Sequence, residues 1–486
     1  MSAENPERSC SEILAEFAVN LAYERVPPAV AAKVKTHIID SIGVGMAGST
    51  MEWCRQASSV VQRLDGPPEA TVLGGGKRIA APNAAMANGV AIASMDYDDT
   101  DYVGGGHHMS RSVVPAALAV AEMVHAGGIE VIAAVTAGYE VVGRVGSALL
   151  LDRYGSRGAN AGWTADDLAK HHRMQRQGGS LVRGFIPGLY GSAVAAGRLL
   201  GLNAEQIASA QGLVGGLGLF LGQSHREGAD GLMLNSGWAA HAGILAALWA
   251  REGLLGPRYI YEGDRGVLAV IGGDLQDPAC LTKGLGTEWN SMNNMLKFYP
   301  AGHGTHHFIE SLKSLMNEHG LLAEDIEQIE CRAPAQRVEF HFLPVEAKLH
   351  PTPYTGRFSM PYLLARLLLD RELGPLSFTP QKVSEPAAID LARRVTYVSD
   401  EAAWYGQTRG LVTVTLRGGR TLSRSSPDLL GFPRRPHTRD DVVGKFRANA
   451  ALVFEDAKRL DDLVNGLEAL EQVKDICEIL SLTAAA

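Results

Sequence analysis

The chain has 486 residues, with 45 Lys and Arg against 53 Asp and Glu, which gives a formal net charge of −8. Nucleic-acid binding needs a clustered basic face, and no such cluster is present, so we expect no nucleic-acid partner. The five cysteines stand singly, which argues against a disulfide framework, a structural zinc site or an iron–sulfur cluster. The polar start and the lack of a long apolar run predict no membrane association and a reducing, cytoplasmic location.

The first part of the chain predicts amphipathic helices. Apolar residues recur at helical spacing over residues 11–46, and Pro27 and Pro28 divide this region into two helices. Residues 69–78 contain three consecutive glycines but lack the Walker spacing, and Ile79 stands where a hydroxyl residue would be needed. A plain turn is therefore predicted there rather than a phosphate-binding loop.

Residues 88–122 have the composition of a functional site. An apolar helix of small residues is followed by a loop with acids, three glycines and two adjacent histidines, and then by a second Ala-rich helix. The acids are Asp96, Asp98, Asp99 and Asp101, and the histidines are His107 and His108. Glycines let the chain turn sharply, so such a loop can bring carboxylates and imidazoles together. We predict a catalytic loop.

Metal binding is the main alternative for this loop. An EF-hand starting at Asp96 would need Gly at its sixth position and Glu at its twelfth, where Asp101 and His107 stand. A helical magnesium–diphosphate site would space its acids differently, and a zinc site with both histidines would need a distant third ligand. For any single Asp, helix capping at the surface is the plainer alternative. We therefore predict an acid/base site without a metal.

Helices with one long interruption are predicted for the middle of the chain. Residues 112–150 are rich in Ala, Val and Gly and predict two closely packed helices. Residues 152–183 are polar and charged, which predicts an insertion that serves as a lid or a partner contact. Helices return over 191–201, 203–220 and 235–253, and no strand precedes their glycines, so a dinucleotide-binding motif is not predicted.

A second candidate site lies in residues 297–307. This segment contains Lys297, His303, His306 and His307, and it leads into a predicted helix. The positive end of a helix dipole favours anions and lowers the pKa of a nearby imidazole. The segment is therefore suited to bind a carboxylate.

The last third predicts an α+β domain followed by helices. Residues 326–333 and 394–398 alternate like strands, and residues 411–416 and 421–425 flank two glycines in a hairpin pattern. Arg357 stands just before an apolar helix. Two further helices, predicted over 438–454 and 460–480, pack back onto the rest. We predict a mainly α fold, with a large all-helical domain (1–275 plus 438–486) and a smaller inserted α+β domain (276–437).

These motifs, in this order, resemble the MmgE/PrpD family, which includes 2-methylcitrate dehydratases, cis-aconitate decarboxylases and iminodisuccinate epimerases. The resemblance rests on Asn88-Gly89, on Asp96-Tyr97-Asp98-Asp99-Thr100, on His108 with Ser110 and Pro115-Ala116, on Gly191-Ser192-Ala193 before Leu199-Leu200-Gly201-Leu202, on Lys297 with Tyr299-Pro300 and His306, and on Arg357-Phe358-Ser359 with Pro361-Tyr362. It covers almost the whole chain. It implies a helical domain interrupted by an α+β domain, a site between them without metal or cofactor, and a homodimer.

The resemblance also implies which residues line the pocket, namely Asp96, Thr100, His108 and Lys297. An imidazole changes charge near neutral pH, so His108 suits an acid or base role, while Asp96 orients the ring or accepts the proton. Lys297 and Arg357 suit substrate carboxylates, the Arg by a bidentate pair. The complete predicted set has Asp96, His108, Lys297, Thr100 and His107 as catalytic residues, and Arg357, His303, His306, Arg111 and Tyr299 as substrate-binding residues.

The chain departs from the family pattern at several cationic positions. Ala93 stands where a His is common, Ile186 replaces a second His, and Leu232 and Asn235 replace a Lys and a His. Gly302 stands at a further pocket position, with His303 beside it. Fewer cations are therefore available to bind a tricarboxylate than in the usual family member.

The predicted function is that of a cofactor-independent lyase, a dehydratase (hydro-lyase) of a small hydroxy-polycarboxylic acid. Removing a proton next to a carboxylate develops negative charge, which requires nearby cations and a base whose pKa is near neutrality. The alternatives are an epimerase or isomerase, a decarboxylase of a small dicarboxylate, and a catalytically decayed structural or regulatory homologue.

Overall fold

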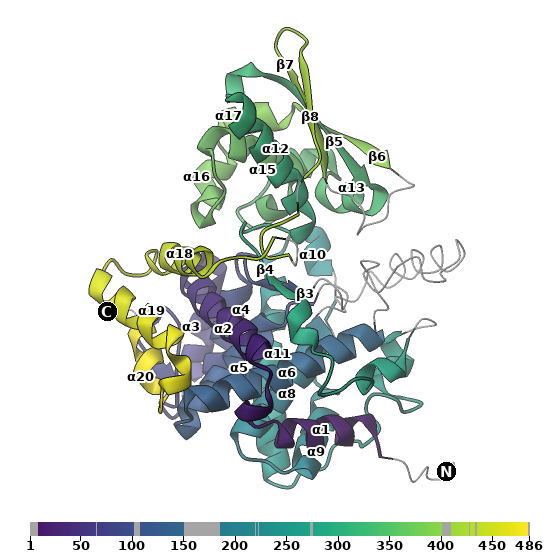
Figure 1. Cartoon of the computed structure of the whole chain (residues 1–486), viewed down its shortest axis with the longest axis vertical. Coiled ribbons are helices and arrows are strands. Elements are labelled where there is room, and N and C mark those ends of the chain that lie inside the picture. Colours follow the sequence, from purple (N-terminus) through teal and green to yellow (C-terminus); the bar gives the residue numbers. More distant parts are fainter. Residues whose placement is uncertain are drawn as a thin grey trace.

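The computed structural model describes residues 8–64, 66–101, 107–149, 185–218, 220–221, 223–272, 276–400, 410–426, 428–432 and 435–484. The polar segment 152–183, predicted as an insertion and candidate lid, lies outside these residues, as do the three glycines of the acidic loop. The fold is mainly α with a smaller α+β part, as predicted, and Figure 1 shows the α+β part above the helical part. Across the ranges just given, no helix has the length and apolar character needed to cross a membrane.

The larger part is a stack of helices. They are α1 (Cys10–Asn20), α2 (Pro28–Ser49), α3 (Glu52–Leu64), α4 (Ala81–Ala93), α5 (Ser110–Val124), α6 (Gly128–Leu149), α8 (Ile186–Leu199), α9 (Ala204–Val214), α10 (Gln223–Glu227) and α11 (Leu234–Arg251). Nearly every residue of α4, α6 and α8 is buried, because these helices pack against others on several sides. Small residues make this possible: a Cβ on Gly89 of α4 would lie only 2.8 Å from the Cα of Gly237 in α11.

Local signals set several helix ends in this part. Ser9 caps α1 in a reciprocal capping box with Glu12, and Asn203 caps α9 in the same way with Gln206. Pro28 occupies the first turn of α2, where its missing N–H costs nothing. The helix starts predicted at residues 11 and 203 are close to those of the structure, whereas the helix predicted over 203–220 already ends at Val214.

Three C-terminal helices return to the helical part, namely α18 (Arg439–Ala450), α19 (Ala457–Glu468) and α20 (Cys477–Leu480). The prediction of one continuous helix over 460–480 is wrong. Asp456 caps α19, so this helix begins earlier, and it ends at Glu468. The chain then leaves the helix because Val473 O accepts a hydrogen bond from Gly128 N (2.9 Å) and Ile476 N donates to Ala126 O (3.0 Å).

The smaller part is built around a four-stranded sheet of order β6-β5-β7-β8. Its strands are β5 (Ile326–Pro334), β6 (Val395–Asp400), β7 (Leu411–Leu416) and β8 (Thr421–Arg424). The sequence predicted all four, and β7 and β8 form the expected hairpin. The helices are α12 (His306–His319), α13 (Ala335–His341), α14 (Val345–Leu349), α15 (Met360–Asp370), α16 (Pro380–Val383) and α17 (Pro386–Ala392). This part has its own apolar core, which begins at Tyr299.

Two short antiparallel strand pairs lie in the helical part. The strands β1 (Ala70–Thr71) and β2 (Arg78–Ile79) enclose the glycine turn that the sequence predicted. The strands β3 (Asp99–Asp101) and β4 (Asn294–Leu296) pair Asp99 with Leu296, a contact the sequence did not predict. This second pair brings the acidic loop beside the segment that leads to Lys297.

Candidate active site

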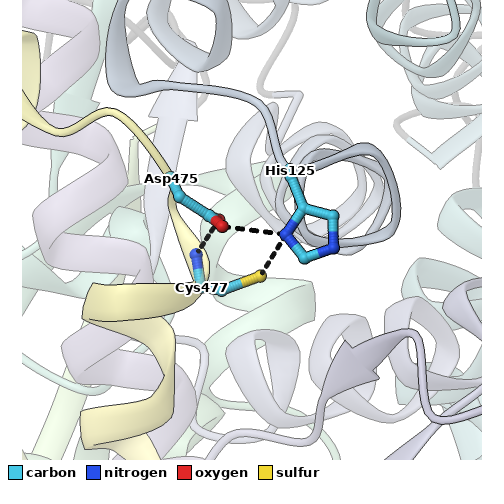
Figure 2. A group of neighbouring side chains, drawn as sticks. All are labelled: His125, Asp475 and Cys477. Atoms are coloured by element: carbon cyan, nitrogen blue, oxygen red, sulfur yellow. Dashed lines mark hydrogen bonds and ion pairs between the residues drawn. The ribbon is translucent and has the colours of Figure 1, made fainter.

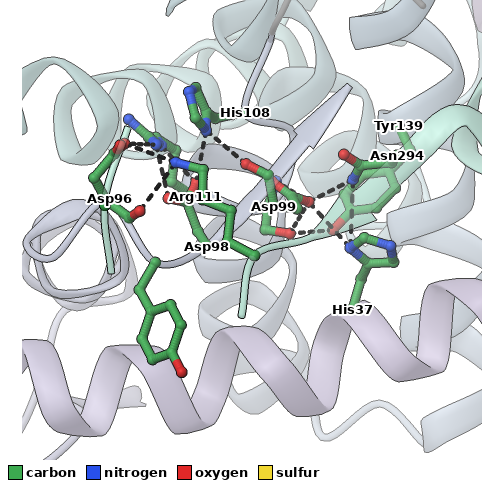
Figure 3. Close-up of polar contacts among 12 residues, drawn as sticks. His37, Asp96, Asp98, Asp99, His108, Arg111, Tyr139 and Asn294 are labelled. Atoms are coloured by element: carbon green, nitrogen blue, oxygen red, sulfur yellow. Dashed lines mark hydrogen bonds and ion pairs between the residues drawn. The ribbon is translucent and has the colours of Figure 1, made fainter. Parts of the chain in front are cut away.

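The acidic loop begins with a sharp change of direction at the end of α4. Asp96 has φ 49°, a left-handed conformation that Gly, Asn and Asp tolerate better than other residues. The chain then enters β3, and α5 starts at Ser110. The carboxylates of Asp96 and Asp98 are thereby placed against Arg111 in the first turn of α5, as Figure 3 shows.

Asp98 is the most strongly paired carboxylate of the site. Arg111 donates two hydrogen bonds to it, from Nε and Nη2, each 2.7 Å long, and His108 Nδ1 lies 3.2 Å from Asp98 Oδ2. Burial alone would raise the pKa of Asp98, but the charge of Arg111 and the contact with His108 outweigh burial and hold the pKa well below its ordinary value. Asp98 is therefore an ionised anchor for these two residues.

Asp96 connects the acidic loop to the second candidate site. Lys297 Nζ lies 2.9 Å from Asp96 Oδ1 and donates a 3.0 Å hydrogen bond to the Asp96 carbonyl oxygen. Burial would raise the pKa of Asp96, but Lys297, His108 and Arg111 together lower it, so the carboxylate is ionised. The two segments that the sequence singled out thus meet at one place.

His108 is placed to act as a base. Its Nδ1 lies 2.6 Å from the carbonyl oxygen of Asp99, which can only accept, so Nδ1 carries the proton and Nε2 of the neutral ring carries the lone pair. Burial lowers the pKa of His108, and the nearby Arg111 lowers it further. The side chain is 20% exposed, whereas Asp98 beside it is fully buried, so the ring is the more accessible of the two.

A second layer of polar residues holds Asp99 from the other side. His37 Nδ1 lies 3.2 Å from its carboxylate, and the Ser110 backbone N–H donates to it at 3.1 Å. Ser110 Oγ and Asn294 Nδ2 contact the same carboxylate, and Tyr139 forms a 2.7 Å hydrogen bond with Ser110. Burial would raise the pKa of Asp99, and the hydrogen bond with His37 is the foremost effect that lowers it.

The sequence did not predict the roles of these supporting residues. Asp98 and Asp99 were part of the acidic motif but not of the predicted site, and His37, Asn294 and Tyr139 were not singled out. The available signal was His37, a histidine among the buried and mostly apolar residues of α2. Its partner Asp99 lies 62 residues away, so the sequence alone did not reveal the pairing.

Arg357 is a fully buried guanidinium near the same cluster. Its guanidinium carbon lies 4.5 Å from the ring centre of Phe378 and 5.7 Å from that of Trp53, and it donates to the Pro353 carbonyl oxygen. Burial lowers its pKa to about 10, and Asp96 is the foremost charge that opposes this effect. Within the described residues, Arg357 Nε has no hydrogen-bond partner.

Two histidines of the second segment, the buried His306 and the partly buried His303, have pKa values that keep them neutral. His306 Nε2 lies 3.1 Å from the Ala301 carbonyl oxygen, and its ring packs edge-on against Tyr299 and His303. Burial, followed by the charge of Lys297, lowers the pKa of His306 to about 3, and burial also holds the pKa of His303 well below its ordinary value. The Tyr299 hydroxyl donates a 2.6 Å hydrogen bond to Glu310.

His107 and Thr100 differ in where they lie. The ring of His107 faces α6, because a Cβ on Gly146 would lie only 1.9 Å from its Nε2, so it packs into the helical core. Thr100 lies in β3, and successive strand residues face opposite sides, so its hydroxyl is on the side opposite to Asp99. In the described part of the chain, this buried hydroxyl has no hydrogen-bond partner.

The donor set of the site fits a metal ion poorly. Ligand atoms of Asp96, Asp98 and His108 lie within 4.8 Å of one another, a grouping that could hold a cation. Both carboxylates, however, already pair with Arg111, and Asp96 also pairs with Lys297. A divalent cation there would face two fixed positive charges, so the donor set fits an organic acid better than a metal.

Apolar residues stand beside the site at the positions where the resemblance implied cations. Ala93 and Leu232 belong to a buried cluster with Val90, Tyr354 and Phe358. Gly302 lies against Phe358, because a Cβ at this position would be 3.0 Å from the Phe358 ring. Ile186 is buried at the start of α8. These positions are thus surrounded by hydrocarbon, whereas Asp96, His108, Lys297 and Arg111 lie together.

Comparison with known proteins gives the same family at full length. The family profile described as MmgE/PrpD N-terminal domain matches residues 12–278, and the MmgE/PrpD C-terminal domain matches residues 299–469. The chain is 25% identical to the cis-aconitate decarboxylase of Aspergillus terreus, over 98% of this chain and 97% of that protein. It is 28% identical to the cis-aconitate decarboxylase of Homo sapiens, over 98% of this chain and 94% of that protein. On these matches, the chain belongs to the MmgE/PrpD family.

Proposed function

We propose that the chain is a lyase that breaks a bond next to a carboxylate in a small polycarboxylic acid. The observation that carries this proposal is the buried contact of Lys297 with Asp96, beside His108 and Arg111, which joins two segments that are 201 residues apart. The similarity to cis-aconitate decarboxylases over 98% of the chain supports the same class of reaction and of substrate.

The charges of the site suit a reaction that develops an anion. Loss of a proton or of CO₂ next to a carboxylate leaves negative charge on carbon and oxygen, and fixed cations stabilise that charge. Lys297 and Arg111 are the cations closest to His108 and Asp96. In this proposal Arg357 binds a substrate carboxylate, since its buried Nε lacks a hydrogen-bond partner within the described chain.

His108 is the proposed acid/base group. Because Nδ1 is held by the Asp99 carbonyl oxygen, the neutral ring presents Nε2 as the atom that accepts a proton. Asp98 contacts the same ring and stabilises the imidazolium that forms. In dehydration, Nε2 takes a proton from the substrate carbon and gives it to the leaving hydroxyl. In decarboxylation, which removes no substrate proton, Nε2 takes a proton from solvent and gives it to the carbanion carbon that remains after CO₂ leaves.

Decarboxylation is the specific reaction that we put first. The relatives that support it are the fungal and human cis-aconitate decarboxylases named above. The apolar residues around Ala93 and Leu232 support it too, because a carboxylate is lost more readily from a poorly hydrated environment. Dehydration is the second candidate, and it rests on His108, which can first remove a proton and then protonate the leaving hydroxyl.

The experiment is a substrate panel read by mass spectrometry in H₂O and D₂O. The purified chain is incubated with cis-aconitate, citrate, 2-methylcitrate and amino-dicarboxylates, each in a separate reaction. Loss of CO₂ supports decarboxylation, loss of water supports dehydration, and deuterium uptake without either supports epimerisation. A folded chain that converts none of these acids would contradict the proposed lyase.

A matched pair of variants connects this turnover to the site. His108→Ala removes the proposed base, whereas His319→Ala removes an exposed histidine at the end of α12. We expect His108→Ala to lose about 10²–10⁴-fold in kcat, the usual contribution of a general acid or base, and His319→Ala to retain turnover. Equal activity of the two variants would exclude His108 from the reaction.

We also propose that the chain forms a homodimer, as the family resemblance implies. Several large apolar side chains are exposed in the single chain, with Leu255 at 83% and Val270 at 71%. Light scattering coupled to size-exclusion chromatography measures the mass directly. A mass of one chain over the micromolar range would contradict this proposal.

A further inference from the structure

A second cluster of reactive side chains lies at the opposite end of α5 from the candidate active site. It consists of His125, Asp475 and Cys477, which Figure 2 shows pointing toward one another. His108 precedes the start of α5, whereas His125 follows its end, and a helix of 15 residues is about 22 Å long. The two clusters are therefore separate, and the proposed reaction uses none of these three residues.

Backbone hydrogen bonds fix the two segments that carry this cluster. His125 ends α5 with φ 55°, and its side chain is 68% exposed. The loop after it is joined to the C-terminal segment by Ile476 N donating to Ala126 O and by Gly128 N donating to Val473 O. Asp475 and Cys477 then face His125 across 350 residues of sequence.

We propose that His125, Asp475 and Cys477 form a binding site for a divalent cation of the zinc type. An imidazole nitrogen, a thiolate and a carboxylate are the three kinds of ligand that Zn²⁺ takes in proteins. All three ligand atoms lie within 4.8 Å of one another. An ion there would tie the start of α20 to the end of α5 and hold the C-terminal segment on the helical part.

Two of the three distances between these ligand atoms can be compared with those of a zinc site. Tetrahedral ligands with a Zn–S bond of about 2.3 Å and Zn–N and Zn–O bonds of about 2.1 Å lie ~3.6 Å apart for S and N, and ~3.4 Å apart for N and O. The Cys477 Sγ to His125 Nδ1 distance is 3.7 Å, and the His125 Nδ1 to Asp475 Oδ2 distance is 2.8 Å. The second distance must open by ~0.6 Å, which the exposed His125 ring can provide by rotation.

The surrounding charges favour a cation. The carbonyl oxygen of Glu122 lies 3.6 Å from Cys477 Sγ, and the carboxylate of Asp475 is part of the cluster. One cation, Arg78, has its Nη2 4.0 Å from the same sulfur. Its guanidinium is already held by the Glu122 carboxylate at 3.0 Å and by the carbonyl oxygens of Pro68 and Glu69. A bound ion would therefore meet mainly oxygen, nitrogen and sulfur donors.

The exposure of His125 leaves the fourth position of a tetrahedral ion facing solvent. Zinc sites with three protein ligands and one water are typically open to exogenous ligands. The sequence argued against a structural zinc site because the cysteines stand singly, but that argument concerns ligands close together in the chain. Here folding supplies the partners of Cys477 from a distant helix end.

The test measures zinc binding by the intact chain. The protein is stripped with a chelator, mixed with one equivalent of Zn²⁺, desalted and analysed by elemental mass spectrometry. We expect about one zinc per chain to be retained, and we expect Co²⁺ in its place to give the near-ultraviolet absorption of a cobalt–thiolate bond. Failure to retain zinc, or cobalt bound without that absorption, would overturn the proposal.

Two variants locate the site. Cys477→Ser removes the sulfur, and His125→Asn removes the imidazole while keeping a residue that tolerates the left-handed backbone. Each is expected to weaken zinc binding by about tenfold or more, since even residues behind the ligands change metal affinity by 10–100-fold. Zinc should raise the melting temperature of the unmodified chain and leave that of both variants unchanged.

Control variants separate this site from other thiols and from the active site. Cys10→Ser changes a partly buried thiol elsewhere in the chain, and His108→Ala removes a ligand of the Asp96, Asp98 and His108 group. Both should retain zinc as the unmodified chain does. If His108→Ala abolishes zinc binding while His125→Asn and Cys477→Ser preserve it, the ion belongs to the active site and the proposal is wrong.

Discussion

At the scale of single residues, the site depends on how buried charges are compensated. Asp96 and Asp98 remain ionised in the protein interior because Lys297, Arg111 and His108 surround them. Removing one partner from such a group leaves another buried charge uncompensated. This lowers the free energy of unfolding by more than the intact pair contributes to it. The proposed reaction uses these cations a second time, to stabilise the anion that forms.

Lys297→Met tests this double role. The variant removes the ammonium that contacts Asp96 and should lower kcat by about 10²-fold or more, the typical loss when one stabilising group of a developing anion is removed. The pKa of Asp96 should rise without Lys297, so the acidic limb of kcat/KM should move to higher pH. Lys458→Met, at an exposed lysine of α19, is the control. An unchanged pH profile would show that Lys297 does not act on Asp96.

His306 predicts a definite dependence of stability on pH. Its folded pKa of about 3 lies below the ordinary value of 6.5, so the unfolded chain takes up its proton first as the pH falls. The stability that depends on neutral His306 is therefore complete above about pH 6.5 and is lost progressively toward pH 3. His306→Gln should reduce this slope by about 1.4 kcal/mol per pH unit between pH 6 and 4. Urea unfolding at several pH values, with His319→Gln as control, measures the difference.

At the scale of elements, α18 supports the acidic loop from the C-terminal end of the chain. Lys445 of α18 lies 2.7 Å from Asp40 of α2, and both side chains are 2% exposed. The same ammonium donates a 2.8 Å hydrogen bond to the Tyr97 carbonyl oxygen and lies 4.0 Å from the centre of the Tyr97 ring. Tyr97 stands between Asp96 and Asp98, so this contact between α2 and α18 also positions the site.

Lys445→Met measures the strength of that support. The change leaves Asp40 buried without its partner, and breaking a buried pair in this way costs about 3–5 kcal/mol of stability. The double variant Asp40→Leu with Lys445→Met removes both charges and should recover most of this loss, as apolar replacements of buried pairs often do. Chemical denaturation of the two variants supplies the comparison. If the double variant is no more stable than the single one, the pair contributes by packing rather than by charge.

At the scale of the whole molecule, the sequence predicted the elements better than their long-range contacts. The helices of the helical part and the four strands of the sheet follow from apolar periodicity and turn residues, which act over a few positions. The pairing of β3 with β4 joins two three-residue strands about 195 residues apart, too short for an alternating pattern. For the same reason His37, which holds Asp99, resembled an ordinary buried residue, and the packing of the His107 ring against α6 was not predicted.

Arg357 tests whether the site joins the two parts of the molecule. It is carried by a 3-10 helix (Thr355–Phe358) that precedes α15 of the smaller part, and its guanidinium lies near Trp53 of α3 in the helical part. Arg357→Lys keeps the positive charge but loses the planar fork that binds a carboxylate in two places. If Arg357 holds a carboxylate that does not react, KM should rise by about tenfold, equivalent to about 1.4 kcal/mol, with little change in kcat.

The control for Arg357→Lys is Arg393→Lys, at an arginine whose side chain is 57% exposed after α17. A larger effect on kcat than on KM would place Arg357 beside the reacting carbon instead of beside a distant carboxylate. Unchanged kinetics in a folded Arg357→Lys variant would mean that the substrate contacts only the helical part. The kinetics of these variants therefore decide whether both parts bind the same substrate molecule. If they do, Arg357 holds one carboxylate of the substrate while His108 faces the reacting carbon. The two cores must then stay in fixed contact.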